Sequence, residues 1–313
     1  MKFKQIKKKS LLFIILIMIF YVSLTLASDI TKIIYHFSNI KYEFIPLILM
    51  IQFLALVIKG LRQKKLLDDI NVRLTFKENL RIYFAGISLV STPLGLGQAI
   101  KSQIIKEKYG ISRSKTLPII ILERFFDLVA ITLIVVFTIM LFFNVQSIII
   151  ASLSSFILIF AYVLLLKGNL NYISRLFSKI RILKKILPSD EIYESLHTSL
   201  KSKQMIISIG LSVIIWMIDA FAVYLVFLSF DLNFNFIQST QYYLTSLVYG
   251  SISFLPGGVG LTEGSLITQL MQSDLDLSLS SAVTLFVRSA TIWFATIIGL
   301  LFSFQFIGKK LSK

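Results

Sequence analysis

The sequence contains no cysteine, only two histidines, and half as many acidic as basic residues. Without cysteine the chain has neither disulfides nor thiolate metal sites. His36 and His197 fall in predicted loops, and the sequence offers no cluster of His and Cys ligands, no Ser/His/Asp arrangement and no Walker-type phosphate loop. We therefore expect a protein that is not an enzyme and that uses no cofactor or metal.

Charged residues are also scarce, at 15% of the chain, whereas 56% of the residues are hydrophobic and the mean hydropathy is +0.82. This composition is far more apolar than that of a soluble domain and predicts a polytopic membrane protein. The formal net charge of +16 would suggest nucleic-acid binding in a soluble protein. In a membrane protein Lys and Arg instead set the topology, so we expect no nucleic-acid partner.

Six segments are apolar and long enough to span a bilayer, which takes about 20 residues. They are residues 11–27, 44–58, 118–143, 148–166, 205–230 and 282–307. The first follows a basic N-terminus and precedes no good cleavage site, which favours a retained signal anchor over a signal peptide. Two further apolar segments, residues 80–100 and 242–261, are interrupted by proline and glycine, and each is either a kinked span or a re-entrant hairpin.

The positive-inside rule distinguishes these alternatives, because a span changes the side of all that follows and a hairpin does not. With two hairpins, 28 of the 32 Lys and Arg residues lie in cytoplasmic stretches, namely residues 2–9, 59–81, 101–117, 167–204 and 309–313. If the first segment spanned, the basic stretches on either side of it would lie on opposite faces. We therefore predict an all-α membrane protein with six full spans, two re-entrant hairpins and both termini in the cytoplasm, forming one domain over residues 1–313.

The two hairpin segments are similar to each other. Pro93 precedes Arg124 by 31 residues, and Pro256 precedes Arg288 by 32. Three spans separate the hairpins, so the second enters the membrane from the outside and the first from the cytoplasm. Two such units of opposite orientation form an inverted repeat, which is typical of transport proteins.

The hairpin tips are rich in glycine. Glycine permits positive φ angles, and helix ends at such tips attract anions. Tight helix packing also explains isolated glycines, although it explains a repeated Pro-x-Gly-x-Gly pattern less well. The tip residues are Pro93, Gly95 and Gly97 in the first hairpin and Pro256, Gly257, Gly258 and Gly260 in the second.

Few ionisable residues lie in the predicted spans, where each costs roughly 2.5 to 3.5 kcal/mol at the centre of a helix. Glu123, Arg124 and Asp127 share one helical face. Either Arg124 pairs with an anionic lipid headgroup, or it reaches the cytoplasmic headgroups while Asp127 neutralises it. For Arg288 the candidate partner is Glu263, and the alternative is contact with the outer interface.

Asp219 lies near the centre of the fifth predicted span, beside Trp216. A lone carboxyl there can be protonated and carry a coupling proton, because burial disfavours its charged form. Alternatively, it is the partner of Arg288 or Arg124.

Helix starts are also predicted near the hairpins. Thr75 and Glu78 have the capping-box spacing and would start the first arm of the first hairpin. Ser114 and Ser278 are candidate N-caps for the spans that contain Arg124 and Arg288.

Three motifs together resemble the lysylphosphatidylglycerol synthase transmembrane-region family, also called flippase-like domain proteins. They are Pro93-Leu-Gly-Leu-Gly97, Glu123-Arg124-x-x-Asp127, and Pro256-Gly-Gly-Val-Gly-Leu-Thr-Glu263 with Arg288. The resemblance covers nearly the whole chain. One position departs from the family pattern, because Gln98 stands where the first hairpin commonly carries Glu.

The resemblance implies translocation of lipids without identifying the lipid. Aminoacyl transfer in this family belongs to a separate soluble domain, which we expect to be absent because the sequence ends at Lys313. We expect a flippase that moves an anionic lipid or lipid-linked precursor across the cytoplasmic membrane. The alternative is a non-transporting lipid-binding partner of a lipid- or glycan-synthesis enzyme.

Overall fold

The computed structural model describes residues 29–92, 97–165, 195–196, 198–200, 202–252 and 255–307. Every regular element within these ranges is a helix. In chain order they are α2 (Ile30–Ser38), α3 (Phe44–Asp69), α4 (Phe76–Ile87), α5 (Ile100–Tyr109), α6 (Arg113–Leu141), α7 (Val145–Leu165), α10 (Ser202–Ser229), α11 (Phe236–Ile252), η3 (Pro256–Gly258), α12 (Leu261–Met271), α13 (Leu277–Arg288), η4 (Ser289–Trp293) and α14 (Phe294–Ile307). The predicted span 11–27, Pro93 and Gly95 lie outside the described residues.

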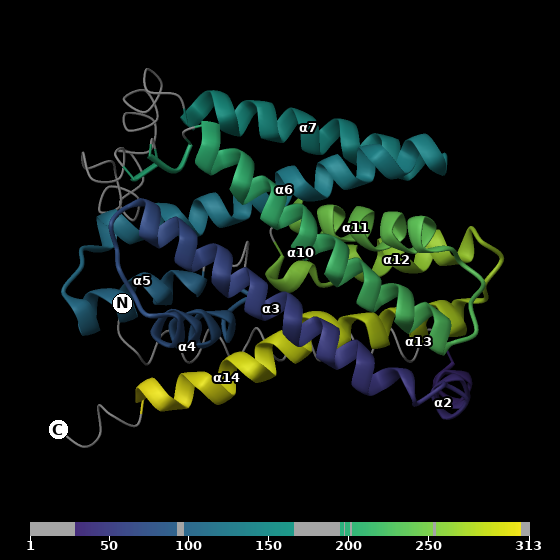
Figure 1. The fold of residues 1–313 in the computed structure, drawn as a ribbon. Coiled ribbons are helices and arrows are strands. Elements are labelled where there is room, and N and C mark those ends of the chain that lie inside the picture. Colours follow the sequence, from purple (N-terminus) through teal and green to yellow (C-terminus); the bar gives the residue numbers. More distant parts are fainter. Residues whose placement is uncertain are drawn as a thin grey trace.

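Long helices run between the two ends of an elongated bundle (Figure 1). Helix α3 packs along α10, and α14 packs along α4. Helices α4 and α5 lie at one end, beside the C-terminal ends of α3 and α14, whereas α11 and α12 occupy the opposite half of the bundle (Figure 1). The two pairs of short helices therefore lie in opposite halves of the bundle.

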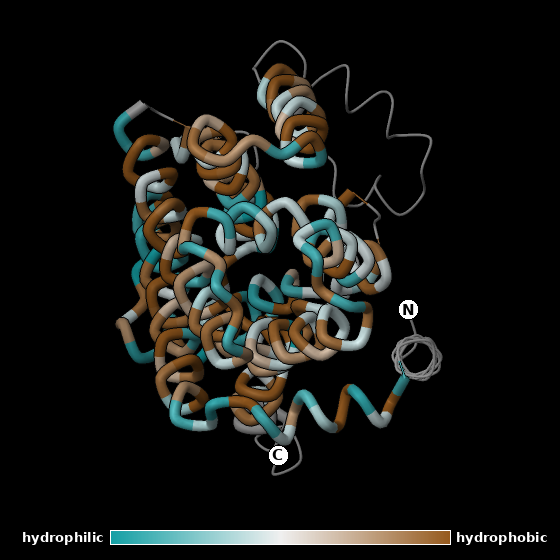
Figure 2. Tube along the Cα trace, turned by 90° about the vertical axis from the view of Figure 1, so that its right-hand side faces the viewer, coloured by the Kyte–Doolittle hydropathy of each residue, from teal (hydrophilic) through white to brown (hydrophobic). Residues whose placement is uncertain are grey.

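The described helices expose apolar side chains and bury polar ones. Met140 on α6 is 77% exposed and Phe156 on α7 is 69% exposed, whereas Gln52, Asn79 and Gln241 are buried. In Figure 2, brown hydrophobic stretches cover much of the outer helices. Three helices within the described ranges are long and apolar enough to cross a membrane, namely Phe44–Asp69, Lys203–Ser229 and Leu277–Ser303. This pattern is that of a membrane protein, in which lipid replaces water around the outer face.

Helix α3 corrects one prediction. It begins at Phe44, as expected, but continues without a break to Asp69 instead of ending near Ile58. The predicted cytoplasmic stretch 59–81 therefore starts inside a helix. Lys and Arg are good helix formers, and the buried partners described below neutralise these side chains.

Helix caps fix the starts of several elements. The Thr75–Glu78 capping box is confirmed at the start of α4. Its hydrogen bonds from the hydroxyl and backbone N–H of Thr75 lower the pKa of the partly exposed Glu78 carboxyl to about 2. The other two predicted caps were wrong by two residues, because Ser112 caps α6 and Asp276 caps α13. In both cases the earlier residue has extended backbone and a side-chain oxygen aimed at the first turn.

Candidate functional site

The second hairpin is held by a buried ion pair. Arg288, at the end of α13, donates from Nε to Oε1 of Glu263 at 2.8 Å, as the sequence predicted. Its Nη2 also donates to the carbonyl oxygen of Gly257. Glu263 Oε2 accepts the backbone N–H of Gly260 at 2.8 Å, in the capping-box position of α12. Because both charged side chains are buried, these contacts tie the hairpin tip to the last span. We name this group the outer pair.

The tip of the second hairpin requires glycine. Gly257, Gly258 and Gly260 have φ angles of 63°, 67° and 94°, in a region that other residues rarely adopt. A Cβ on Gly258 would lie 2.9 Å from the Cα of Gly250, so the backbones of η3 and α11 meet there without side chains between them. The tight packing and the positive φ angles are both present, and both need glycine.

Asp127 on α6 is the centre of a second buried group. Its Oδ1 accepts Nη1 of Arg62 at 2.6 Å and Nε1 of Trp216 at 3.1 Å. Nη1 of Arg124 lies 3.5 Å from the other carboxylate oxygen. Arg62 also donates to the hydroxyl of Ser212 at 2.5 Å. Asp127 thus joins α3, α6 and α10.

The adjacent Glu123 has a partner on the first hairpin. Nζ of Lys101, in the first turn of α5, donates to Glu123 Oε2 at 2.6 Å, and both side chains are buried. Gly86 on α4 makes room for this lysine, because a Cβ there would lie 2.2 Å from Lys101 Cγ. The ring of Tyr83 lies 5.2 Å from the ammonium, within cation–π range.

Asp219 pairs with Lys59, not with Arg124 or Arg288 as the sequence had suggested. Lys59 Nζ lies 3.0 Å from Asp219 Oδ2 and 4.6 Å from the centre of the Trp216 ring. Trp216 therefore contacts both Lys59 and Asp127 and links the two groups. Extension of α3 beyond Ile58 is what places Lys59 within reach of α10.

These groups form what we call the inner network, which has an excess of positive charge. It contains four cations, Lys59, Arg62, Lys101 and Arg124, and three carboxylates, Glu123, Asp127 and Asp219. Arg124 is the most exposed member, with 40% of its side chain accessible, and its Nε makes no hydrogen bond within the described part of the chain. The network can therefore attract one further negative charge, and Arg124 is the member best placed to meet it.

The described edges of the two hairpins approach each other. A Cβ built on Gly257 would lie 3.7 Å from the Cβ of Ser91. Ser91 and Thr92 are the last described residues before the tip of the first hairpin. Gly97 lies near this point, and its N–H donates to Thr92 Oγ1 at 2.7 Å. The same Gly257 position is 3.6 Å from Nη2 of Arg288. The described edges of both tips therefore converge beside the outer pair.

Sequence reasoning missed three charged residues of the inner network, namely Lys59, Arg62 and Lys101. Each was assigned to a cytoplasmic stretch by counting charges. A helical spacing could have found two of them, because Gln52, Lys59 and Arg62 recur on one face of a helix that continues the second predicted span. No comparable signal identifies Lys101.

The site offers ammonium, guanidinium, carboxylate, hydroxyl and amide groups. Within the part of the chain that the structure describes, no group of three or more His, Asp and Glu residues is arranged to hold a metal ion. The side chains present can bind a polar or charged ligand by hydrogen bonds and ion pairs.

Comparison with known proteins identifies relatives over most of the chain. The family model described as the lysylphosphatidylglycerol synthase TM region matches residues 10–299. A UPF0104 membrane protein of Pyrococcus horikoshii is 26% identical over 82% of this chain and 85% of its own length. A UPF0104 membrane protein of Methanocaldococcus jannaschii is 24% identical over 93% of each chain. A third, from Methanothermobacter thermautotrophicus, is 26% identical over 85% of this chain and 84% of its own length.

Proposed function

Because the chain belongs to the lysylphosphatidylglycerol synthase transmembrane-region family, a membrane family related to lipids, we propose that it is a lipid flippase. In this proposal it moves an anionic lipid or lipid-linked precursor between the leaflets of the cytoplasmic membrane and catalyses no covalent reaction. The headgroup follows a polar path between the hairpins while the acyl tails stay in the bilayer. Candidate residues on this path are those of the inner network, the outer pair and the glycines of both tips.

The close approach of Ser91 and Gly257 is the strongest support for the proposal. In this proposal the headgroup passes between the two hairpins, beside polar backbone and buried charge, as at the broken helices that form binding sites in many transporters. The opposite placement of α4 and α5 relative to α11 and α12 supports an inverted repeat (Figure 1). We propose that these pairs are re-entrant hairpins within a domain of six spans and that both termini are cytoplasmic.

The chemistry of the inner network supports an anionic headgroup. A guanidinium forms bidentate hydrogen bonds with phosphate and is always charged, so the accessible Arg124 suits a phosphodiester. The network retains one positive charge after its internal pairs are formed, which a headgroup phosphate would neutralise. A zwitterionic headgroup neutralises this positive charge less completely, because its own net charge is zero.

Vesicles made with purified protein test the proposal. Phosphatidylglycerol and phosphatidylcholine that carry a fluorophore on one acyl chain serve as reporters, and a membrane-impermeant reductant measures how much reporter reaches the outer leaflet. We expect the protein to accelerate exchange of the anionic reporter more than that of the zwitterionic one. Arg124→Gln should slow the anionic reporter by about tenfold or more, because hydrogen bonds to charged groups contribute about 1.5 to 3 kcal/mol.

Arg113→Gln is the matched control, since Arg113 is an exposed arginine at the start of the same helix. It should leave exchange unchanged. Wild-type protein that binds phosphatidylglycerol without accelerating its exchange would contradict the flippase and favour a lipid-binding partner of a lipid- or glycan-synthesis enzyme. Equal rates for Arg124→Gln and wild type would contradict the role of Arg124.

A further inference from the structure

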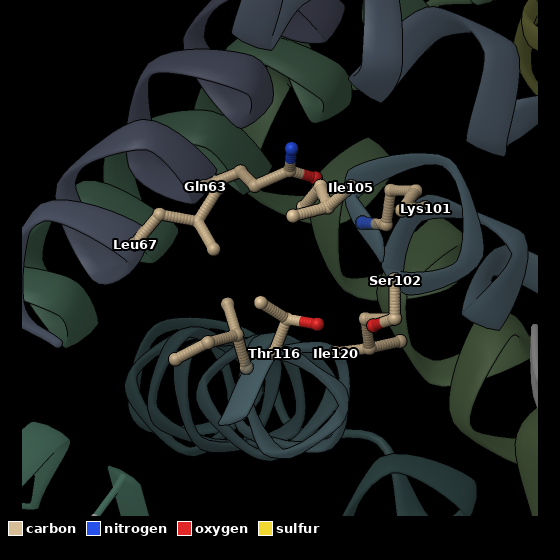
Figure 3. A pocket seen from close by; sticks show the side chains of 8 residues that line it. Gln63, Leu67, Lys101, Ser102, Ile105, Thr116 and Ile120 are labelled. Atoms are coloured by element: carbon tan, nitrogen blue, oxygen red, sulfur yellow. The ribbon is translucent and has the colours of Figure 1, made fainter. Parts of the chain in front are cut away.

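A small pocket lies among α3, α5 and α6, with a polar lining of Gln63, Lys101, Ser102 and Thr116 that aliphatic side chains complete (Figure 3). The space inside admits about one water molecule, which is too little for a headgroup or an acyl chain. A lipid contact of a different kind is offered at the opposite end of the bundle, on the outer surface of α2 (Figure 1).

Helix α2 lies across this end of the bundle. In Figure 1 it is viewed nearly end-on, whereas α3 and α10 are seen from the side, so α2 makes a steep angle with the long helices. A side chain caps its start, because Oδ1 of Asp29 accepts the N–H of Thr31 at 3.1 Å. His36, which falls in a predicted loop, lies in this helix. The chain is therefore helical here, but it does not run along the spans.

The ends of two long helices fix the level of α2 in the bundle. Helix α3 begins at Phe44, shortly after α2 ends, and the backbone N–H of Lys41 between them donates to the carbonyl oxygen of Ser229, the last residue of α10, at 2.9 Å. Lys41 also forms an exposed ion pair with Asp231. Both long helices are apolar and long enough to cross a membrane. Their ends therefore mark a membrane surface, and α2 lies at that surface.

One apolar stripe of α2 holds the helix against the protein. Ile33 and Phe37 lie on it, four residues apart. Ile33 is buried, and the ring of Phe37 packs edge-on against the rings of Phe230 and Phe286, with centres 6.0 and 6.3 Å away. Phe230 directly follows α10 and Phe286 lies on α13, so α2 is fixed to two elements of the bundle.

A second apolar stripe, next to the first, is exposed. Ile30 and Ile34 lie on it, again four residues apart, and are 50% and 61% exposed. The opposite side of the helix carries the exposed Thr31 and Lys32. The helix is thus amphipathic, and its apolar side packs on the protein only in part. This pattern is typical of helices that lie in the interface of a membrane.

The exposed stripe adjoins a surface that faces lipid. The chain passes from α2 through the exposed Tyr42 into α3, where Met50 is 63% exposed on a helix able to cross the membrane. The hydroxyl of Tyr42 donates to the carbonyl oxygen of Phe37 at 2.9 Å, which keeps this residue beside α2. Tyrosine is enriched at membrane interfaces, because its ring is apolar and its hydroxyl is polar. Lipid is therefore the partner that fits the exposed stripe.

We propose that α2 lies in the membrane interface and inserts Ile30 and Ile34 among the acyl chains, while Lys32 faces the headgroups and water. The partner of this surface is the lipid layer itself. Insertion is favourable because it removes two large apolar side chains from water. The inference concerns membrane contact alone, so it holds whether or not the protein moves lipids.

Spin labels on single cysteines test this placement, since the chain has no cysteine of its own. Ile34→Cys, Lys32→Cys and Met50→Cys are labelled separately and reconstituted into vesicles of phosphatidylglycerol and phosphatidylcholine. Collisions of each label with oxygen, which concentrates in the bilayer, are compared with collisions with a water-soluble nickel chelate. We expect the label of Ile34→Cys to meet oxygen more than nickel, as that of Met50→Cys does, at a depth of about 5 to 10 Å into the interface. Lys32→Cys is the matched control on the opposite side of α2, and its label should meet nickel more than oxygen.

Two results would overturn the proposal. If the label of Ile34→Cys were as open to nickel as that of Lys32→Cys, α2 would lie in water. If the label were shielded from both reagents, protein would cover the stripe, either the predicted span 11–27 of this chain or a second copy. Lipid exchange is measured separately in vesicles of the wild type, so either result would leave the flippase proposal standing.

Discussion

The two hairpins hold their charges in opposite ways. The outer pair joins Arg288 to Glu263, is closed by backbone groups of the second tip and is almost inaccessible. The inner network spreads four cations and three carboxylates over several helices and leaves Arg124 accessible. Similar Pro-Gly segments followed by Arg at matching distances can therefore serve two purposes. One fixes a tip, and the other leaves charge available for a ligand.

Removal of Arg288 should have the largest effect on stability. Arg288→Met removes the guanidinium that faces the buried Glu263 carboxylate, and breaking a buried ion pair in this way costs about 3 to 5 kcal/mol in the free energy of unfolding. Thermal unfolding of the purified protein in detergent would report this loss. The double variant Arg288→Met/Glu263→Met should recover part of it, because both charges of the pair are then removed. If Arg288→Met were as stable as wild type, the outer pair would not be what holds the second tip to the last span.

Removal of Arg62 should lower the free energy of unfolding by less than removal of Arg288 does. In Arg62→Met, Asp127 keeps the N–H of Trp216 and the nearby guanidinium of Arg124. We expect a loss of about 1 to 3 kcal/mol by the same measurement. If Arg62→Met lost as much free energy of unfolding as Arg288→Met, or more, the remaining partners of Asp127 would not compensate for the missing arginine.

Glycine at the second tip should contribute to stability because the backbone there has a positive φ angle. Gly257→Ala places a Cβ at φ 63° and 3.2 Å from Cδ1 of Ile292, so we expect a destabilisation of about 1 to 2 kcal/mol. Gly264→Ala in α12 is the matched control, because a Cβ there meets no atom within 4 Å. Alanine is the better helix former, so this control should be neutral or stabilising by up to about 1 kcal/mol. If alanine changed the free energy of unfolding equally at the two positions, the tip would have no particular requirement for glycine.

The sequence predicted the outer pair and the Arg124–Asp127 pair of the inner network, but not the cations that α3 and α5 contribute to that network, for a physical reason. Few charges lie near the second tip, so Arg288 had one nearby candidate partner, Glu263. Around the first hairpin many basic residues are close in sequence, and charge counting treats them all as topology signals. Only folding distinguishes Lys59 or Lys101, which turn inward, from Lys108, which stays largely exposed. The resemblance in sequence covered both tips, but it could not identify partners contributed by α3 and α5.

The smallest expected effect concerns the cap of the first hairpin. Hydrogen bonds from Thr75 lower the pKa of Glu78 from 4.5 to about 2, so its contribution to stability is present above pH 4.5 and is lost as the pH falls toward 2. Glu78→Gln should therefore flatten the dependence of the unfolding temperature on pH between these values, because it lowers that temperature near neutral pH and leaves it nearly unchanged near pH 2. If the slope of the variant in this acid range matched that of wild type, Glu78 would have no such role.

A disulfide between the hairpin tips tests whether the tips meet and whether the headgroup passes between them. The chain has no cysteine of its own, and the separation of 3.7 Å between the Ser91 Cβ and a Cβ on Gly257 matches the spacing in disulfides. We expect Ser91→Cys/Gly257→Cys to crosslink under mild oxidation and to stop exchange of the anionic reporter, and reduction should restore it to the level of the single variants. A pair that does not crosslink would contradict the meeting of the tips. A crosslinked protein that still exchanges lipid would contradict a headgroup path between them.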